Sequence, residues 1–370
     1  MIDAKINVVG QGPAGLLAAT ILRLRGFRVS VIAKSAGSLA MWSGELSFGR
    51  NGGDDLDGWL SPDDWKAAWS SGLRALREAR VPVPVEVPEK PLQTVTALGV
   101  LKPAFVAPLW QHLFTEAGSA CFIGIGGVSD ALPRTQARRY AATTGMSSSY
   151  RLLPSPFGWN ASWGPLRFAG FFDTEEGLEW LVRSVQKEVG KVDEEYVYFP
   201  QVLGVEKVMA TCERLSAIFG KPVYEFPLLA PSLGGIRIEK LLVKQLKRLG
   251  VEFYRATVAS VDPGGTVTAM DGRRFVGQAT ILATGGVLGG GLAVDMEGSI
   301  TDPITGQTVG MVKEAQDLSS AGYGKVDLRG DASLLAVGGQ VGVWNPDRDH
   351  NGGAKILGTV HQAIRNLEAR

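Results

Sequence analysis

Six residues near the start of the chain have the types and the spacing to bind a phosphate. They are Gly10-Gln11-Gly12-Pro13-Ala14-Gly15, which follow the pattern G-x-G-x-x-G. In this pattern the first glycine allows a tight turn, the second lets a phosphate approach the backbone, and the third lets helix and strand pack closely. Free N–H groups at the start of the following helix would then hold the phosphate. A tight turn with no ligand is the alternative.

The flanking residues predict the elements that such a loop needs. The apolar run at 6–9 is typical of a buried parallel strand, and residues 16–24 carry apolar side chains at helical spacing. Pro13 suits the first turn of that helix, because the N–H that proline lacks has no helical partner there. Residues 27–32 predict a second strand. This order of strand, loop, helix and strand favours a phosphate-bearing cofactor over the ligand-free turn.

The end of the second strand bears on which cofactor binds. A carboxylate usually stands there and binds the ribose of an adenosine. Here the strand ends Ile32-Ala33-Lys34-Ser35, without an acid. Lys34 would suit a 2′-phosphate or the phosphate of a mononucleotide better than a ribose diol.

Composition excludes several classes of protein. In 370 residues, 45% are hydrophobic and 20% are charged, which is the balance of a soluble globular protein. A net charge of +1 argues against nucleic-acid binding. Two distant cysteines offer no metal or redox spacing, so we expect buried free thiols and no metal site. We expect no signal peptide and no transmembrane segment, hence a cytoplasmic protein that could still dock at the inner face of the cell membrane through a partner.

Two proline-rich crossings suggest how the chain is divided. Residues 81–91 alternate proline with valine and cannot be helical, and residues 227–235 mark a return. We therefore predict one discontinuous domain, 1–50 and 228–370, with an inserted α+β cap at 51–227. Within the cap we expect a strand at 94–101 and a long loop at 143–165.

The later part of the chain carries two more glycine segments. Residues 251–276 predict a β-meander with an Asp-Gly hairpin turn, which leads into the run Ala-Thr-Ile-Leu-Ala-Thr-Gly-Gly at 279–286. The second segment is a strand ending in Gly338-Gly339, followed by His-Asn-Gly-Gly at 350–353 and a final helix. The fold class expected from these elements is α/β, Rossmann-like.

The three segments in this order resemble the two-dinucleotide-binding-domain flavoproteins. Longer stretches narrow the likeness: WSGELSFG at 42–49, TALGVLKPAF at 96–105, FIGIGGVSD at 122–130, YFPQVLGVE at 198–206, FPLLAPSLGGIRIEKLL at 226–242 and ATGGVLGGGL at 283–292. These look like the B-subunit family of anaerobic glycerol-3-phosphate dehydrogenases. The resemblance implies an FAD/NAD(P)-binding flavoprotein fold in which the discontinuous domain binds the flavin and the cap serves the substrate or a partner.

The resemblance also implies a reaction and its partners. A flavin, FMN preferred and FAD the alternative, would work with an FAD-bearing dehydrogenase subunit and an iron–sulfur subunit. The complex would oxidise sn-glycerol 3-phosphate to dihydroxyacetone phosphate and pass electrons to a quinone. Together, the residues and the resemblance predict these cofactor-binding positions: Gly10, Gly12, Pro13, Ala14, Gly15, Lys34, Ser43, Gly44, Thr284, Gly285, Gly338, Gly339, Asn351, Gly352 and Gly353.

Candidates for catalysis are few. Oxidation of an alcohol needs a base near the flavin ring, and the chain has three histidines, of which His350 lies in the last glycine segment. Arg237 and Lys102 are candidate anion binders, with ordinary surface charge as the alternative. This scarcity leaves two other hypotheses open: a stand-alone FAD-dependent oxidoreductase of another substrate, or a non-catalytic subunit that holds a relay flavin or serves as a scaffold.

Overall fold

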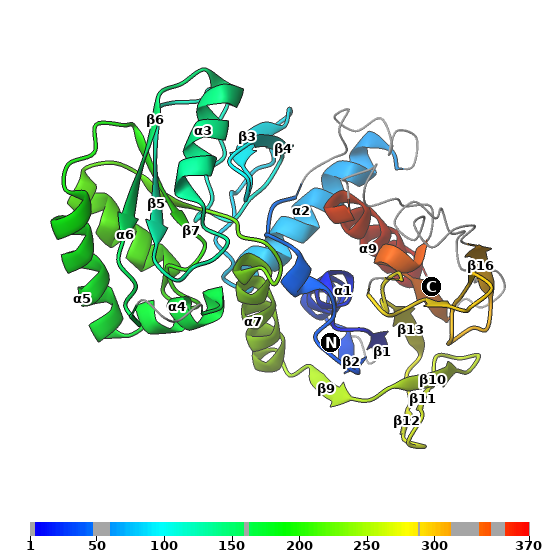
Figure 1. Ribbon diagram of the computed structural model, residues 1–370. Helices are drawn as coiled ribbons and strands as arrows, with labels where there is room; N and C mark the ends of the chain where they lie inside the picture. Colours follow the sequence, from blue (N-terminus) through cyan, green and yellow to red (C-terminus); the bar gives the residue numbers. More distant parts are fainter. Residues whose placement is uncertain are drawn as a thin grey trace. The chain divides into compact units, whose positions relative to one another are not determined.

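The computed structural model describes residues 4–46, 60–158, 163–287, 289–311, 333–341 and 352–369 (Figure 1). The chain divides into two compact units. Unit 1 comprises residues 1–39, 46–87 and 239–370, and unit 2 comprises residues 40–45 and 88–238. Helix α7 (Leu233–Arg248) begins in unit 2 and ends in unit 1.

Unit 1 is built on a five-stranded parallel sheet. The strands lie in the order β17-β13-β1-β2-β9, so the first two strands of the chain lie inside the sheet. Their bounds are β1 (Lys5–Val9), β2 (Arg28–Ala33), β9 (Glu252–Arg255), β13 (Ala279–Leu282) and β17 (Leu334–Ala336). The carboxyl ends of all five strands meet at one edge, which is where ligands bind in open parallel sheets.

Three helices of unit 1 pack against one another. They are α1 (Pro13–Leu24), α2 (Pro62–Glu78) and α9 (Gly352–Glu368). The Ser61 hydroxyl caps α2 by accepting a hydrogen bond from the Asp64 N–H, as Ser-Pro-Asp-Asp predicts. The compact units differ here from the domains that the sequence predicts. The predicted cap includes residues 51–87, but α2 belongs to unit 1 because its apolar stripe packs on α1 and α9.

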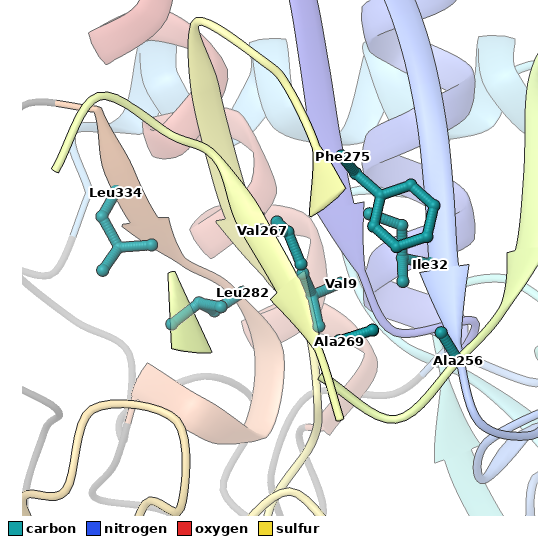
Figure 2. Packing of buried hydrophobic residues seen from close by; sticks show 8 residues of the cluster. All are labelled: Val9, Ile32, Ala256, Val267, Ala269, Phe275, Leu282 and Leu334. Carbon is teal, nitrogen blue, oxygen red and sulfur yellow. The ribbon is translucent and has the colours of Figure 1, made fainter. Parts of the chain in front are cut away.

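A β-meander covers part of the sheet in unit 1. Strands β10 (Val258–Val261), β11 (Val267–Ala269) and β12 (Arg274–Phe275) pair antiparallel. Figure 2 shows the apolar cluster that joins the meander to the sheet, made of Val9, Ile32, Ala256, Val267, Ala269, Phe275, Leu282 and Leu334. The buried Asn7 of β1 reinforces this junction, since its amide donates to the carbonyls of Gly265 and Phe275 (3.1 and 2.9 Å). Three short strands, β14 (Ala293–Val294), β15 (Ser299–Thr301) and β16 (Thr308–Met311), form a further antiparallel sheet.

Unit 2 has a parallel sheet of its own. Strands β5 (Ala120–Ile125), β6 (Ser148–Leu153), β7 (Tyr196–Pro200) and β8 (Val223–Phe226) lie in the order β6-β5-β7-β8. The connecting helices are α3 (Pro133–Thr144), α4 (Pro165–Phe172), α5 (Glu175–Ser184), with its continuation η3 (Val185–Val189), and α6 (Val208–Phe219). A hairpin of β3 (Leu92–Val95) and β4 (Leu101–Ala104) precedes them.

The predicted fold class is confirmed: the chain is α/β, with a Rossmann-like parallel sheet and a β-meander. Two local predictions were wrong. The strand expected at 94–101 is two strands joined by a turn at Gly99, whose φ is +79°. The long loop expected at 143–165 contains β6, which forms because its backbone pairs with β5. Cys121 and Cys212 are buried free thiols, as expected.

Candidate functional site

The glycine loop between β1 and α1 has the geometry that its sequence predicts. Gly10 has φ of +119°, and a Cβ there would collide with the carbonyl oxygen of Ala283 in the neighbouring strand connection. A Cβ at Gly15 would collide with the carbonyl oxygen of Gly10. At Gly12, by contrast, a Cβ would meet no atom within 4 Å. Gly10 and Gly15 are thus fixed by packing, whereas Gly12 faces open space.

The start of α1 offers backbone donors to that space. Gly12 stands at the cap position, Pro13 is the first helical residue, and no described side chain caps the helix. The N–H groups of the first turn, which include those of Ala14 and Gly15, have no helical acceptors in any α-helix. A helix start without a side-chain cap, beside a glycine that has free space at its Cβ position, is suited to bind a phosphate oxygen.

The connection after β13 and the turn after β17 both contact this loop. Gly338 opens the 3-10 turn η5 (Gly338–Val341), and a Cβ at Gly338 would lie 2.8 Å from the Ala14 Cβ. A Cβ at Gly339 would lie 2.6 Å from the backbone nitrogen of Gly286. Three glycine segments that are far apart in sequence therefore converge at the carboxyl edge of the sheet, as their order predicts.

Gln340, which sequence reasoning missed, lies buried at this convergence. Its Oε1 accepts a hydrogen bond from the Thr284 hydroxyl (2.8 Å), while its Nε2 is buried and has no partner among the described residues. A buried donor without an acceptor costs free energy, on the order of 1–3 kcal/mol. A ligand oxygen at this position would remove that cost.

The last helix contributes its amino end. Gly352 and Gly353 form the first turn of α9, and the Gly338 N–H donates to the Thr359 hydroxyl of this helix (2.9 Å). This bond fixes η5 against α9 within unit 1. Two predicted site residues, His350 and Asn351, lie outside the described residues.

A carboxylate that the sequence did not reveal lies beside the glycine loop. Gln11 Nε2 donates to Glu239 Oε1 (3.0 Å), and Glu239 comes from α7, more than 200 residues away. Both side chains are half-buried. Burial raises the pKa of Glu239, and the hydrogen bond from Gln11 opposes that rise. No local sequence signal announces this pairing, because a helical glutamate is ordinary by itself.

The other predicted cofactor residues are Lys34, Ser43 and Gly44. Lys34 is exposed and directly follows β2. Ser43 and Gly44 belong to unit 2, where the Ser43 carbonyl accepts a hydrogen bond from Gln111 Nε2 (2.7 Å). The cofactor-binding roles of these three residues remain predictions.

Arg237 requires a correction, because its guanidinium already has an anionic partner. Its side chain is fully buried in unit 2, where Nη1 and Nη2 donate to the Glu225 carboxylate and Nε donates to the Gly204 carbonyl (2.7 Å). Glu225 also accepts from the Leu203 N–H (2.7 Å). The interpretation of Arg237 as a binder of a substrate anion is therefore replaced by a structural ion pair.

Lys102 is likewise paired. Its ammonium contacts the carboxylate of Glu45, which is buried in unit 2. Lys102 keeps about a third of its side chain exposed, at 36%. Because the two opposite charges neutralise each other, this pair offers less to an anionic substrate than a free lysine would.

Of the two remaining histidines, His112 makes a poor general base. His112 is buried in unit 2 among aromatic rings, stacked on Tyr224 at 4.3 Å and hydrogen-bonded to the Tyr198 hydroxyl (2.7 Å). Desolvation lowers the pKa of His112 to about 4, so the ring is neutral at pH 7. His361 lies within α9, with Nε2 at 3.6 Å from the Asp64 carboxylate.

Asp173, between α4 and α5 in unit 2, is an anion that binds backbone N–H groups of the protein itself. Residues 205–207 lead into α6, and the Asp173 carboxylate accepts hydrogen bonds from the backbone N–H groups of Val205 and Lys207 (both 2.9 Å). The cap of the next helix, α5, is Thr174, whose hydroxyl accepts a hydrogen bond from the Gly177 N–H. Asp173 thus already satisfies donors that a ligand could otherwise use.

The described residues of unit 1 fit a phosphate-bearing cofactor. Gly12 leaves space for it, the start of α1 supplies uncapped donors, and Gln340 supplies a buried unpaired donor. No group of three or more His, Cys, Asp or Glu side chains that could hold a metal ion occurs among the described residues. In the same part of the chain, no helix has the length and apolar character to cross a membrane.

Comparison with known proteins gives one distant group of relatives. No family model matches the chain. Two proteins from strains of Halobacterium salinarum, each named as the probable B subunit of an anaerobic glycerol-3-phosphate dehydrogenase, are 24% identical over 337 residues, which is 82% of this chain and 78% of theirs.

Solved structures share still less sequence. The tetrameric form of 2-methyl-3-hydroxypyridine-5-carboxylic acid oxygenase is 11% identical, with a TM-score of 0.37 over 100% of this chain and 87% of that chain. The tryptophan 5-halogenase MibH is 13% identical, with a TM-score of 0.36 over 99% of this chain and 66% of that chain.

Proposed function

We propose that this chain is a flavin-dependent oxidoreductase, and specifically the flavoprotein subunit of a glycerol-3-phosphate dehydrogenase complex. The observation that carries the flavin assignment is the convergence of three glycine segments around Gly12, together with the buried Gln340 Nε2, which has no partner among the described residues. The name of the two Halobacterium salinarum relatives, a probable dehydrogenase B subunit, supports the choice of dehydrogenase and the existence of partner subunits. A flavin bound here would accept a hydride equivalent from the substrate carbon.

The chain's own residues would bind and orient this cofactor. The first turn of α1 would hold a phosphate, Gly12 would let it approach, and Gln340 would donate to a polar oxygen of the cofactor. The complex would oxidise sn-glycerol 3-phosphate to dihydroxyacetone phosphate. Electrons would reach a quinone through an FAD-bearing dehydrogenase subunit and an iron–sulfur subunit, with the assembly held peripherally at the inner face of the membrane.

A second candidate, a protein that relays electrons without oxidising the substrate, is favoured by one observation. Arg237 and Lys102, two of the residues proposed for catalysis, are engaged by Glu225 and Glu45. If the substrate is oxidised on a partner, this chain needs a flavin but no base. A stand-alone FAD-dependent oxidoreductase of another substrate is the third candidate.

One experiment separates these candidates. The flavin-loaded chain, alone and co-purified with its partner subunits, is mixed anaerobically with sn-glycerol 3-phosphate, and bleaching of the flavin's visible absorption is followed. Bleaching only in the complex supports the proposed function, and a lag behind the partner's flavin identifies the relay form. Bleaching of the isolated chain by an unrelated substrate supports the stand-alone enzyme. A purified complex that never reduces its flavin with this substrate contradicts the proposal.

A further inference from the structure

The contact between Gln11 and Glu239 places a carboxylate where the second strand of the sheet lacks one. In dinucleotide-binding folds an acid that follows the second strand hydrogen-bonds the ribose hydroxyls of an adenosine. Strand β2 ends at Ala33 and is followed by Lys34, so this chain has no acid at that point. Glu239 reaches the glycine loop from a different element, α7.

Helix α7 is held in a fixed position beside the loop. Near the middle of the helix, Glu239 accepts a hydrogen bond from Gln11, which stands between Gly10 and Gly12. Beyond its carboxyl end, the Arg23 guanidinium of α1 donates through Nε to the Leu249 carbonyl (2.7 Å). Glu239 is the first residue of α7 that belongs to unit 1, and its contact with the loop that follows β1 places it at the carboxyl edge of the sheet. This is the edge where an adenosine would extend.

The carboxylate retains capacity for a ligand. Among the described residues Glu239 makes no ion pair, and Gln11 occupies only Oε1. An ionised carboxylate accepts hydrogen bonds on two oxygens, so Oε2 remains able to accept one from a hydroxyl. A vicinal diol supplies such a donor, whereas a phosphate would be repelled by the negative charge.

We infer that Glu239 binds the ribose diol of an adenosine and thereby makes the chain select FAD over FMN. This inference rests on the proposed function, because it presupposes a flavin in unit 1. It reverses the expectation from Lys34, which favoured a mononucleotide. The acid has moved from the end of β2 to α7, and Gln11 orients it through its side-chain amide.

Titration of the full-length apoprotein with FAD and with FMN, followed by flavin fluorescence, tests the inference. The wild-type chain is expected to bind FAD at least about tenfold more tightly than FMN, as one hydrogen bond to a charged group allows. Glu239→Ala is expected to weaken FAD binding about tenfold or more and to leave FMN binding within about twofold. Glu239→Gln keeps the shape and the contact with Gln11 but lacks the charge, and an intermediate loss is expected. Glu213→Gln, which removes the same charge from the exposed face of α6 in unit 2, is the matched control.

A second readout separates ligand binding from a structural role. Displacement of FAD by ADP and by 2′-deoxy-ADP should differ by about tenfold in the wild-type chain and should become equal in Glu239→Ala. If both Glu239 variants bind FAD as the wild type does, or lose FAD and FMN equally, the inference is wrong while the proposed function stands. If the wild-type chain binds neither flavin, the proposed function fails and the inference fails with it.

Discussion

Replacement of Arg237 by alanine distinguishes a structural ion pair from a substrate anchor. The side chains of Arg237 and Glu225 are both fully buried, and the guanidinium also donates to the Gly204 carbonyl. Removing it leaves the Glu225 carboxylate buried, with the Leu203 N–H as its remaining donor among the described residues. Breaking a buried pair from one side costs about 3–5 kcal/mol.

This loss should be visible in thermal unfolding. For a unit of about 160 residues, each kcal/mol lowers the melting temperature by roughly 2–4 °C, so a drop of roughly 6–20 °C is expected. Differential scanning calorimetry of the wild type, Arg237→Ala and the double variant Arg237→Leu with Glu225→Leu makes the comparison. The double variant should be more stable than the single one, because no unpaired charge remains buried. A single variant that melts like the wild type but binds glycerol 3-phosphate more weakly would refute this reasoning.

Three further predictions follow from the sites described above. Gly12→Ala should melt close to the wild type, because its Cβ meets no atom, but it should lose flavin. Gly15→Ala should lose both flavin and stability, because its Cβ collides with the Gly10 carbonyl. Flavin content and melting curves measure both effects, and a flavin-loaded Gly12→Ala would count against the proposed position of the phosphate. Gln340→Leu should weaken flavin binding about tenfold by fluorescence titration, as the loss of one hydrogen bond implies, and unchanged affinity would remove Gln340 from the site. Burial lowers the pKa of His112 from 6.5 to about 4, so protonation of this ring disfavours the folded state. The free energy of unfolding should therefore be highest above pH 6.5 and should fall by roughly 3 kcal/mol as the pH falls toward 4. Urea unfolding at several pH values should show this dependence of the unfolding free energy on pH, and His112→Phe should reduce it.

The elements around the glycine loop could be predicted because their signals are local. Strand β1, helix α1 and strand β2 follow from an apolar run, a glycine pattern and helical spacing within about 30 residues. The convergence of Thr284 and Gly338 on that loop could be predicted from the order of the segments, through a family resemblance. Strand β6 could not, because Ser-Ser-Tyr-Arg has little apolar alternation, and its pairing with β5 overrides that composition.

The partners of charged side chains could not be predicted. Arg237 beside Gly-Gly resembles an anion site whether the anion is a ligand or Glu225, and only the fold supplies Glu225. The role of Glu239 could not be predicted because no residue near it in the sequence indicates that it contacts Gln11. Both residues lie on α7, which shows that helical periodicity identifies a buried face but not what each polar side chain will meet.

The most direct test of the central claim is the identity and amount of flavin released from the purified chain. The protein is expressed, purified with its yellow colour monitored, denatured, and its supernatant separated by chromatography against FAD and FMN standards. About one flavin per chain is predicted, held by the loop at Gly10–Gly15. A chain that carries no flavin, even after incubation with both FAD and FMN, would contradict the account.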